Sequence, residues 1–207
     1  MSMNYITVDV SANKQTATLC IARPEVKNAF NEAVIVEILE ALGALAANKA
    51  LRLLKISGKG GFFSAGADLQ WMKQVAGYSY EENLRESDSL QQLFQQVYKF
   101  PAVTLARVEG GCFGGANGLV AAADLAVAEE NAIFRFSEVA LGLVPATIAP
   151  YVIRKTGEYA AKHLIGVGRI PQIGRIGETV LVLAFKHRRA RRAVIAVRQP
   201  VKTFQLI

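Results

Sequence analysis

The fold of this 207-residue chain is decided by two stretches, Phe62-Phe-Ser-Ala-Gly-Ala-Asp-Leu69 and Glu109-Gly-Gly-Cys-Phe-Gly-Gly-Ala-Asn-Gly118. Each stretch follows an expected strand and opens an expected helix, so the first amides of both helices lack partners within the helix and face the loop. Two such amides meeting at one oxygen would form an oxyanion hole, which stabilises negative charge on a thioester carbonyl. Glycine-rich turns also occur wherever a strand and a helix pack tightly. The two loops alone therefore leave a binding role and a packing role open.

Expected strands and helices alternate around these loops. Residues 5–10 and 16–22 have strand-like patterns on either side of a turn. Asn31 can cap a helix whose apolar residues, from Val34 to Leu45, repeat with the helical period. This alternation predicts βαβ units and an α/β fold. Further strands are expected at 51–57, 101–108 and 125–128, helices at 69–75, at 80–98 and up to about 123, and a loop at 109–117.

Composition excludes several classes of protein. A chain of this length with 52% hydrophobic residues can bury the core of one domain. Cys20 and Cys112 are too few for a disulfide framework and are expected to be reduced thiols. His163 and His187 are the only histidines, and no spacing in the sequence predicts a metal site.

The N-terminus and the apolar runs predict a soluble, cytoplasmic protein. The first residues have no basic segment followed by an apolar one, so we expect no signal peptide. The apolar run from Gly118 to Val127 is interrupted by Asp124 and is too short to cross a bilayer.

The formal charge of +7 is concentrated near the C-terminus. Residues 166–207 hold nine of the 24 Lys and Arg residues and one of the 17 acidic residues, so they carry +8 and residues 1–165 carry −1. A basic run such as Lys186–Arg192 can contact nucleic-acid phosphates. No aromatic residues interrupt it to stack on bases, which argues against a nucleic-acid partner and favours a solvated segment. The nucleotide-binding patterns G-x-G-x-x-G and G-x-x-x-x-G-K-[ST] are missing from the glycine-rich loops.

Four blocks together resemble the signature of the crotonase family, the enoyl-CoA hydratase/isomerase group. The resemblance extends over residues 5–165 in matching order and spacing. It implies an α/β crotonase-like (ClpP/crotonase) spiral of ββα units, a coenzyme A thioester as substrate and no further cofactor. It also implies a homo-oligomer, a trimer or hexamer, if the C-terminal segment permits one. The four blocks are Ala22–Asn31, Phe63–Leu69, Gly114–Asp124 and Phe136–Pro145.

The resemblance also assigns roles to individual residues. The oxyanion-hole amides would be those of Ala67 and Gly115, and Glu138 would be the catalytic acid and base. Glu138 could instead be a surface or helix-capping carboxylate. Gly118 stands where hydratases of this family commonly have a second glutamate. The CoA moiety would be bound by the segments that contain Arg23, Lys27, Ala29, Ala65 and Asp68.

These assignments predict an enoyl-CoA hydratase, a lyase that works with one carboxylate. The sequence around Gly118 and 143–152 is most similar to the methylglutaconyl-CoA hydratase branch. The main alternatives that remain open are a double-bond isomerase that uses the same carboxylate, and a catalytically impaired crotonase fold that acts as a binding protein or has no role. Dehalogenase-like and decarboxylase-like members of the family also remain open. The resemblance ends near residue 165, which divides the chain into a core domain, 1–165, and an atypical basic segment, 166–207. We expect that segment to arise from a shifted reading frame or a rearranged end.

Overall fold

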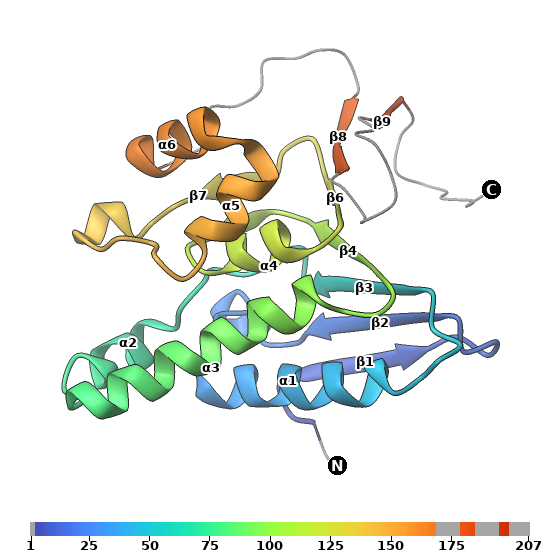
Figure 1. The fold of residues 1–207 in the computed structure, drawn as a ribbon, viewed down its shortest axis with the longest axis horizontal. Coiled ribbons are helices and arrows are strands. Elements are labelled where there is room, and N and C mark those ends of the chain that lie inside the picture. The colour runs from blue at the N-terminus through green and yellow to red at the C-terminus, as the bar shows by residue number, and fades with distance from the viewer. Residues whose placement is uncertain (1–2, 169–178, 185–194, 199–207) are drawn as a thin grey trace.

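The computed structural model describes residues 3–168, 179–184 and 195–198, which Figure 1 shows in colour. Their main sheet has the strand order β1-β2-β3-β4-β6-β8-β9. β1 and β2 form an antiparallel hairpin, β2, β3, β4 and β6 are parallel, and β8 and β9 continue the sheet in antiparallel pairs. The strands are β1 (Ile6–Val10), β2 (Thr16–Ile21), β3 (Leu53–Gly58), β4 (Val103–Val108), β6 (Leu125–Ala128), β8 (Thr179–Ala184) and β9 (Ile195–Arg198).

Helices connect the parallel strands of the main sheet. Helix α1 lies between β2 and β3, α2 and α3 lie between β3 and β4, and α4 precedes β6. The helices are α1 (Glu32–Ala46), α2 (Leu69–Val75), α3 (Tyr80–Tyr98), α4 (Ala116–Ala122), α5 (Ala149–Thr156) and α6 (Glu158–Val167), with 3-10 turns η1 (Pro24–Val26) and η2 (Val139–Leu141). The predicted α/β architecture with parallel crossovers is confirmed.

Local sequence signals set the helix ends. The side chain of Asn31 accepts a hydrogen bond from the amide of Val34 at 3.0 Å, as expected for the cap of α1. Helix α3 begins with a capping box, in which Ser79 and Glu82 each bond the other's backbone amide. Such signals act within one turn of helix, which explains why the bounds of α2 and α3 match the predicted ranges.

The region expected to be a loop at 109–117 is in part a strand. Residues Gly111–Phe113 form β5, which pairs in parallel with β7 (Ile133–Arg135) in a separate two-stranded sheet. The prediction failed here because a strand of three residues is too short to show a periodic pattern. Its partner also lies about 20 residues further along the chain, so no local signal indicates the pairing.

The helices pack in two groups around the sheet, and the groups meet where α3 contacts α4. Helix α1 packs on α3 beside the β1–β3 end, while α4 packs on α5 and α5 on α6 near β7 (Figure 1). The buried core joins the sheet to both groups through apolar side chains such as Ile35, Leu54, Phe94 and Leu119. In the part of the chain that the structure describes, no helix is long and apolar enough to cross a membrane. The basic run Lys186–Arg192 lies outside the described residues.

Candidate active site

The two glycine-rich loops lie side by side and are joined by backbone hydrogen bonds. The amide of Ser64 donates to the carbonyl oxygen of Gly111 at 3.1 Å, and the amide of Phe113 donates to the carbonyl oxygen of Ser64 at 3.0 Å. Gly66 permits this approach: its φ is +83°, and a Cβ atom there would lie 2.5 Å from the carbonyl oxygen of Phe113. A side chain at position 66 would therefore push the loops apart.

The amides of Ala67 and Gly115, the expected oxyanion donors, each follow a residue at this contact. A Cβ atom on Gly66 would lie 3.4 Å from the Cα of Gly114. The amides of Gly66, Asp68 and Gly114 all donate to acceptors in the protein. Among the described residues, no acceptor is found for the amide of Ala67 or of Gly115. A Cβ atom on Gly115 would meet no atom within 4 Å, so the space beside it is open. Two amide donors are thus available near the junction of the loops, and an oxyanion hole needs two such donors aimed at one oxygen.

Glu138 lies beside the second loop, immediately before η2. A Cβ atom on Gly114 would lie 3.4 Å from Oε1 of Glu138 and 3.1 Å from Oγ of Ser137. The other carboxyl oxygen, Oε2, is buried and has no hydrogen-bond partner among the described residues. The side chain makes no capping hydrogen bond to η2, so helix capping does not account for its position.

Burial controls the ionisation of this carboxyl group. Desolvation raises the pKa of Glu138, and a backbone hydrogen bond opposes that rise only in part. Burial also raises the pKa of the Cys112 thiol, and the nearby charge of Glu138 raises it further. A carboxyl group whose pKa is raised toward neutrality can accept a proton and return it within one reaction.

Gly118 leaves no room for a second carboxylate. It lies inside α4, where a Cβ atom would come within 2.5 Å of Cγ2 of Ile148 and 2.7 Å of the ring of Phe94. These two apolar side chains fill the volume that a glutamate at this position would need. The departure from the hydratase pattern is therefore part of the packing of α4 against α3 and α5.

The five expected CoA-binding residues lie in two adjoining segments. One contains Arg23, Lys27 and Ala29, and the other contains Ala65 and Asp68. Nη2 of Arg23 forms an ion pair with Oδ2 of Asp68 at 3.2 Å, and Nη1 donates to the carbonyl oxygen of Ala29 at 2.8 Å. The amide of Ala65 donates to the carbonyl oxygen of Lys27 at 2.9 Å. Arg23, Ala29 and Asp68 are largely buried in this contact, so their side chains join the segments together. Lys27 is exposed, and its Nζ atom lies over the ring of Phe62, 5.5 Å from the ring centroid.

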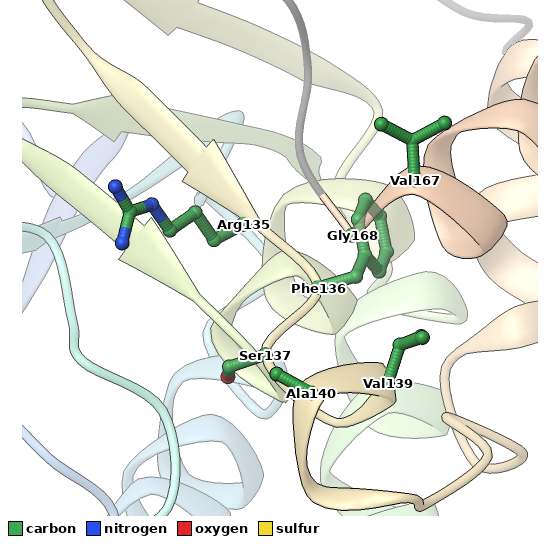
Figure 2. A pocket seen from close by; sticks show the side chains of 7 residues that line it. All are labelled: Arg135, Phe136, Ser137, Val139, Ala140, Val167 and Gly168. Atoms are coloured by element: carbon green, nitrogen blue, oxygen red, sulfur yellow. The ribbon is translucent and has the colours of Figure 1, made fainter.

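A cavity of about 360 Å³ lies next to the connection between β7 and η2. In Figure 2, Phe136 and Val139 extend toward Val167 of α6, whereas Ser137 extends to the other side of the connection. Ala67, Gly115 and Glu138 do not line it, but Ser137 does, and its hydroxyl group lies beside Gly114, so the cavity adjoins the junction of the loops. It is lined by Arg135, Phe136, Ser137, Val139, Ala140, Val167 and Gly168.

Two polar residues at the junction were not singled out from the sequence. Ser137 places its hydroxyl group beside Gly114. Asn117 is buried, and its side chain donates hydrogen bonds to two backbone carbonyls. The available signal for Asn117 was a lone amide side chain in the otherwise apolar sequence of α4, because a buried polar group needs partners.

Comparison with known proteins agrees with this architecture. Residues 11–172 match the family model described as "Enoyl-CoA hydratase/isomerase". A Thermus thermophilus protein named "Putative enoyl-CoA hydratase" is 38% identical over 154 residues, which are 74% of this chain and 61% of that protein. The crystal structure of an enoyl-CoA hydratase from Shewanella pealeana superposes with a TM-score of 0.78 at 37% identity, over 81% of this chain and 63% of the other.

The match covers the site but not the full length of these relatives. The chain spans about three fifths of the length of the proteins it matches. The matched range includes both loops, Glu138 and the segments around Arg23. With the parallel sheet, the paired glycine-rich loops and a family model that covers most of its length, this chain belongs to the enoyl-CoA hydratase/isomerase family, the crotonase family.

Proposed function

We propose that this chain adds water to the double bond of a 2-enoyl-CoA. The observation that carries the proposal is the position of Glu138 next to Gly114, the residue before Gly115, whose amide has no acceptor among the described residues. A carboxyl group is thereby near the amides that would hold the thioester oxygen. The names of the relatives support the same reaction class.

In the proposed reaction, the amides of Ala67 and Gly115 donate to the thioester oxygen and stabilise the enolate that forms. The carboxylate of Glu138 accepts a proton from water while the water oxygen forms a bond to C3 of the enoyl group. The electron pair of the double bond moves into the enolate. Glu138 then returns the proton to C2, which restores the carboxylate and completes the addition of one water molecule.

Further parts of the substrate are assigned by similarity to the family. Lys27 is exposed, and the segment that contains it would follow the adenine and pantetheine parts of coenzyme A. The acyl group would be small and branched, like that of 3-methylglutaconyl-CoA, because the residues around Gly118 and 143–152 are similar to that branch of hydratases.

The direct test follows the absorbance of the conjugated enoyl thioester in 3-methylglutaconyl-CoA and crotonyl-CoA. We expect the absorbance to fall with the wild-type protein and the rate to drop about 10²- to 10⁴-fold in Glu138→Gln. That substitution keeps the shape of the side chain and removes its proton chemistry. Equal rates for the two proteins would refute the role of Glu138. Folded protein without turnover would point to a chain that only binds its ligand.

Double-bond isomerisation is the second candidate, and Gly118 favours it. An isomerase needs one base, which removes a proton from C2 of a 3-enoyl-CoA and delivers it to C4. The packing of Phe94 and Ile148 around Gly118 leaves Glu138 without a second carboxylate from α4. Appearance of a conjugated product from a 3-enoyl-CoA, without consumption of 2-enoyl-CoA, would select this reaction over hydration.

A further inference from the structure

We propose that Asn117 is a positioning residue that fixes the position of the Gly115 amide relative to the Glu138 carboxyl group. This inference rests on the proposed function, because it assigns those two groups to one reaction. Asn117 is the second residue of α4, and it is 5% exposed. No role was expected for it from the sequence.

The side chain of Asn117 joins the two catalytic segments. Its Nδ2 atom donates to the carbonyl oxygen of Gly114 at 3.0 Å and to that of Arg135 at 2.7 Å. Gly114 directly precedes the Gly115 amide, and Arg135 lies three residues before Glu138. One amide group with two protons therefore connects the loop that carries the oxyanion donor to the segment that carries the carboxylate.

This connection lies where the strand pairing ends. The register of β5 and β7 stops at Phe113 opposite Arg135, and the amide of Gly114 makes the next hydrogen bond, to the carbonyl oxygen of Arg135 at 2.8 Å. Beyond this point the two backbones are no longer paired as strands. Asn117 donates to both of them, so it adds a second connection at the end of the ladder.

Small displacements at this point have a large effect on catalysis. An oxyanion donor must lie about 2.7–3.1 Å from the oxygen that it stabilises. A misplacement of about 1 Å can cost about 10²-fold in rate. The backbone carbonyls need not lose all their partners without Asn117, since the Gly114 carbonyl also accepts from the amide of residue 117 and the Arg135 carbonyl from that of Gly114. Removing the side chain is thus expected to let the loop at Gly115 and the segment that carries Glu138 shift relative to each other, and to leave the fold intact.

The test compares Asn117→Leu, which has a similar volume and no donor, with the wild-type protein and Thr104→Val. Thr104 is a suitable control because its buried hydroxyl group donates to Asp124 and accepts from the amide of Asp124, on β4 and away from the loops. We expect Asn117→Leu to lower kcat about 10- to 100-fold with a change in KM of less than about threefold. Thr104→Val should lower the unfolding midpoint and leave kcat unchanged. Asn117→Ser, which keeps one donor, should be intermediate and also replaces the leucine variant if that variant does not fold.

Two measurements that do not depend on catalytic turnover test this inference separately from the proposed function. They are the ¹⁵N shift of the Gly115 amide and the ¹³C shift of the Glu138 carboxyl group. Both signals should move in Asn117→Leu and stay in place in Thr104→Val, even if the wild-type protein consumes neither 2-enoyl-CoA nor 3-enoyl-CoA and the proposed function fails. Unchanged signals, together with unchanged kcat wherever turnover is present, would make Asn117 a packing residue and overturn the proposal.

Discussion

Oε1 of Glu138 lies 3.4 Å from the position that a Cβ atom on Gly114 would occupy. Gly114 adopts a φ of +51° and directly precedes Gly115, whose amide donates to no acceptor among the described residues. The absence of a side chain at Gly114 therefore allows the carboxyl group and the oxyanion loop to approach each other. The proposed chemistry depends on this approach of the two segments, which hydrogen bonds from Gly114 and Asn117 to Arg135 also hold together.

Gly114→Ala tests that contact. The substitution should cost about 1–2 kcal/mol of stability, because an L-residue is strained at this positive φ. It should also lower kcat by up to about 10-fold, since the new methyl group would crowd Oγ of Ser137 at 3.1 Å and Ser137 directly precedes Glu138. Gly142→Ala is the matched control: its φ is +72°, but a Cβ there meets nothing within 4 Å. A similar loss of kcat in both variants would show that backbone strain, and not crowding of Ser137, is responsible.

The pH dependence of kcat/KM should report the ionisation of Glu138. Its carboxylate form is the base toward water, so activity should fall as pH decreases and the group becomes protonated. Burial raises its pKa, so the midpoint of this acid limb should lie above the ordinary glutamate value of 4.5. Initial rates at low substrate concentration across the acid range measure it. An acid limb at or below the ordinary value, or one that persists unchanged in Glu138→Gln, would contradict the assignment.

Glu138→Gln should also stabilise the folded protein at neutral and alkaline pH. A carboxyl group with a raised pKa in the folded state destabilises the fold above that pKa, where it is charged in both the folded and unfolded states. The destabilisation disappears below the unfolded-state pKa, where the group is protonated in both. The unfolding midpoint of the variant should therefore exceed that of the wild type at pH 8, and the two should converge as the pH falls. A difference that stayed constant with pH would rule out ionisation of Glu138 as its cause.

Gly118→Ala should destabilise the protein by about 1–3 kcal/mol, because its methyl group would overlap Ile148 and Phe94. Gly43→Ala in α1 provides the opposite case for a helical glycine. A Cβ at position 43 meets nothing within 4 Å, so this substitution should stabilise the helix by about 0.5–1 kcal/mol. Urea unfolding of both variants measures the two free energies. Equal effects of the same sign would mean that position 118 is not tightly packed.

Much of the fold could be predicted because its signals are local. Asn31 and Ser79 cap α1 and α3 with their own side chains, within one turn of the residues that they bond. The apolar repeat from Val34 to Leu45 predicts which face of α1 is buried, and Leu39, at the edge of that face, is only partly covered. Strand and helix alternation was sufficient to predict the parallel crossovers. Each of these features depends on residues close together in the chain, and so each is visible in the sequence.

The sequence by itself determined the main-sheet strands and the helices up to β6 and the two loops, and through its resemblance to a family it predicted which residues form the site. The tertiary structure alone decided how they meet: Ser64 beside Gly111, Glu138 against Gly114, and Asn117 between two backbone carbonyls. It also decided that Phe94 and Ile148 fill the space beside Gly118. Contacts of this kind join residues that are distant in the chain or belong to different elements. They are set by the close packing of those elements, which no periodic pattern in the sequence encodes.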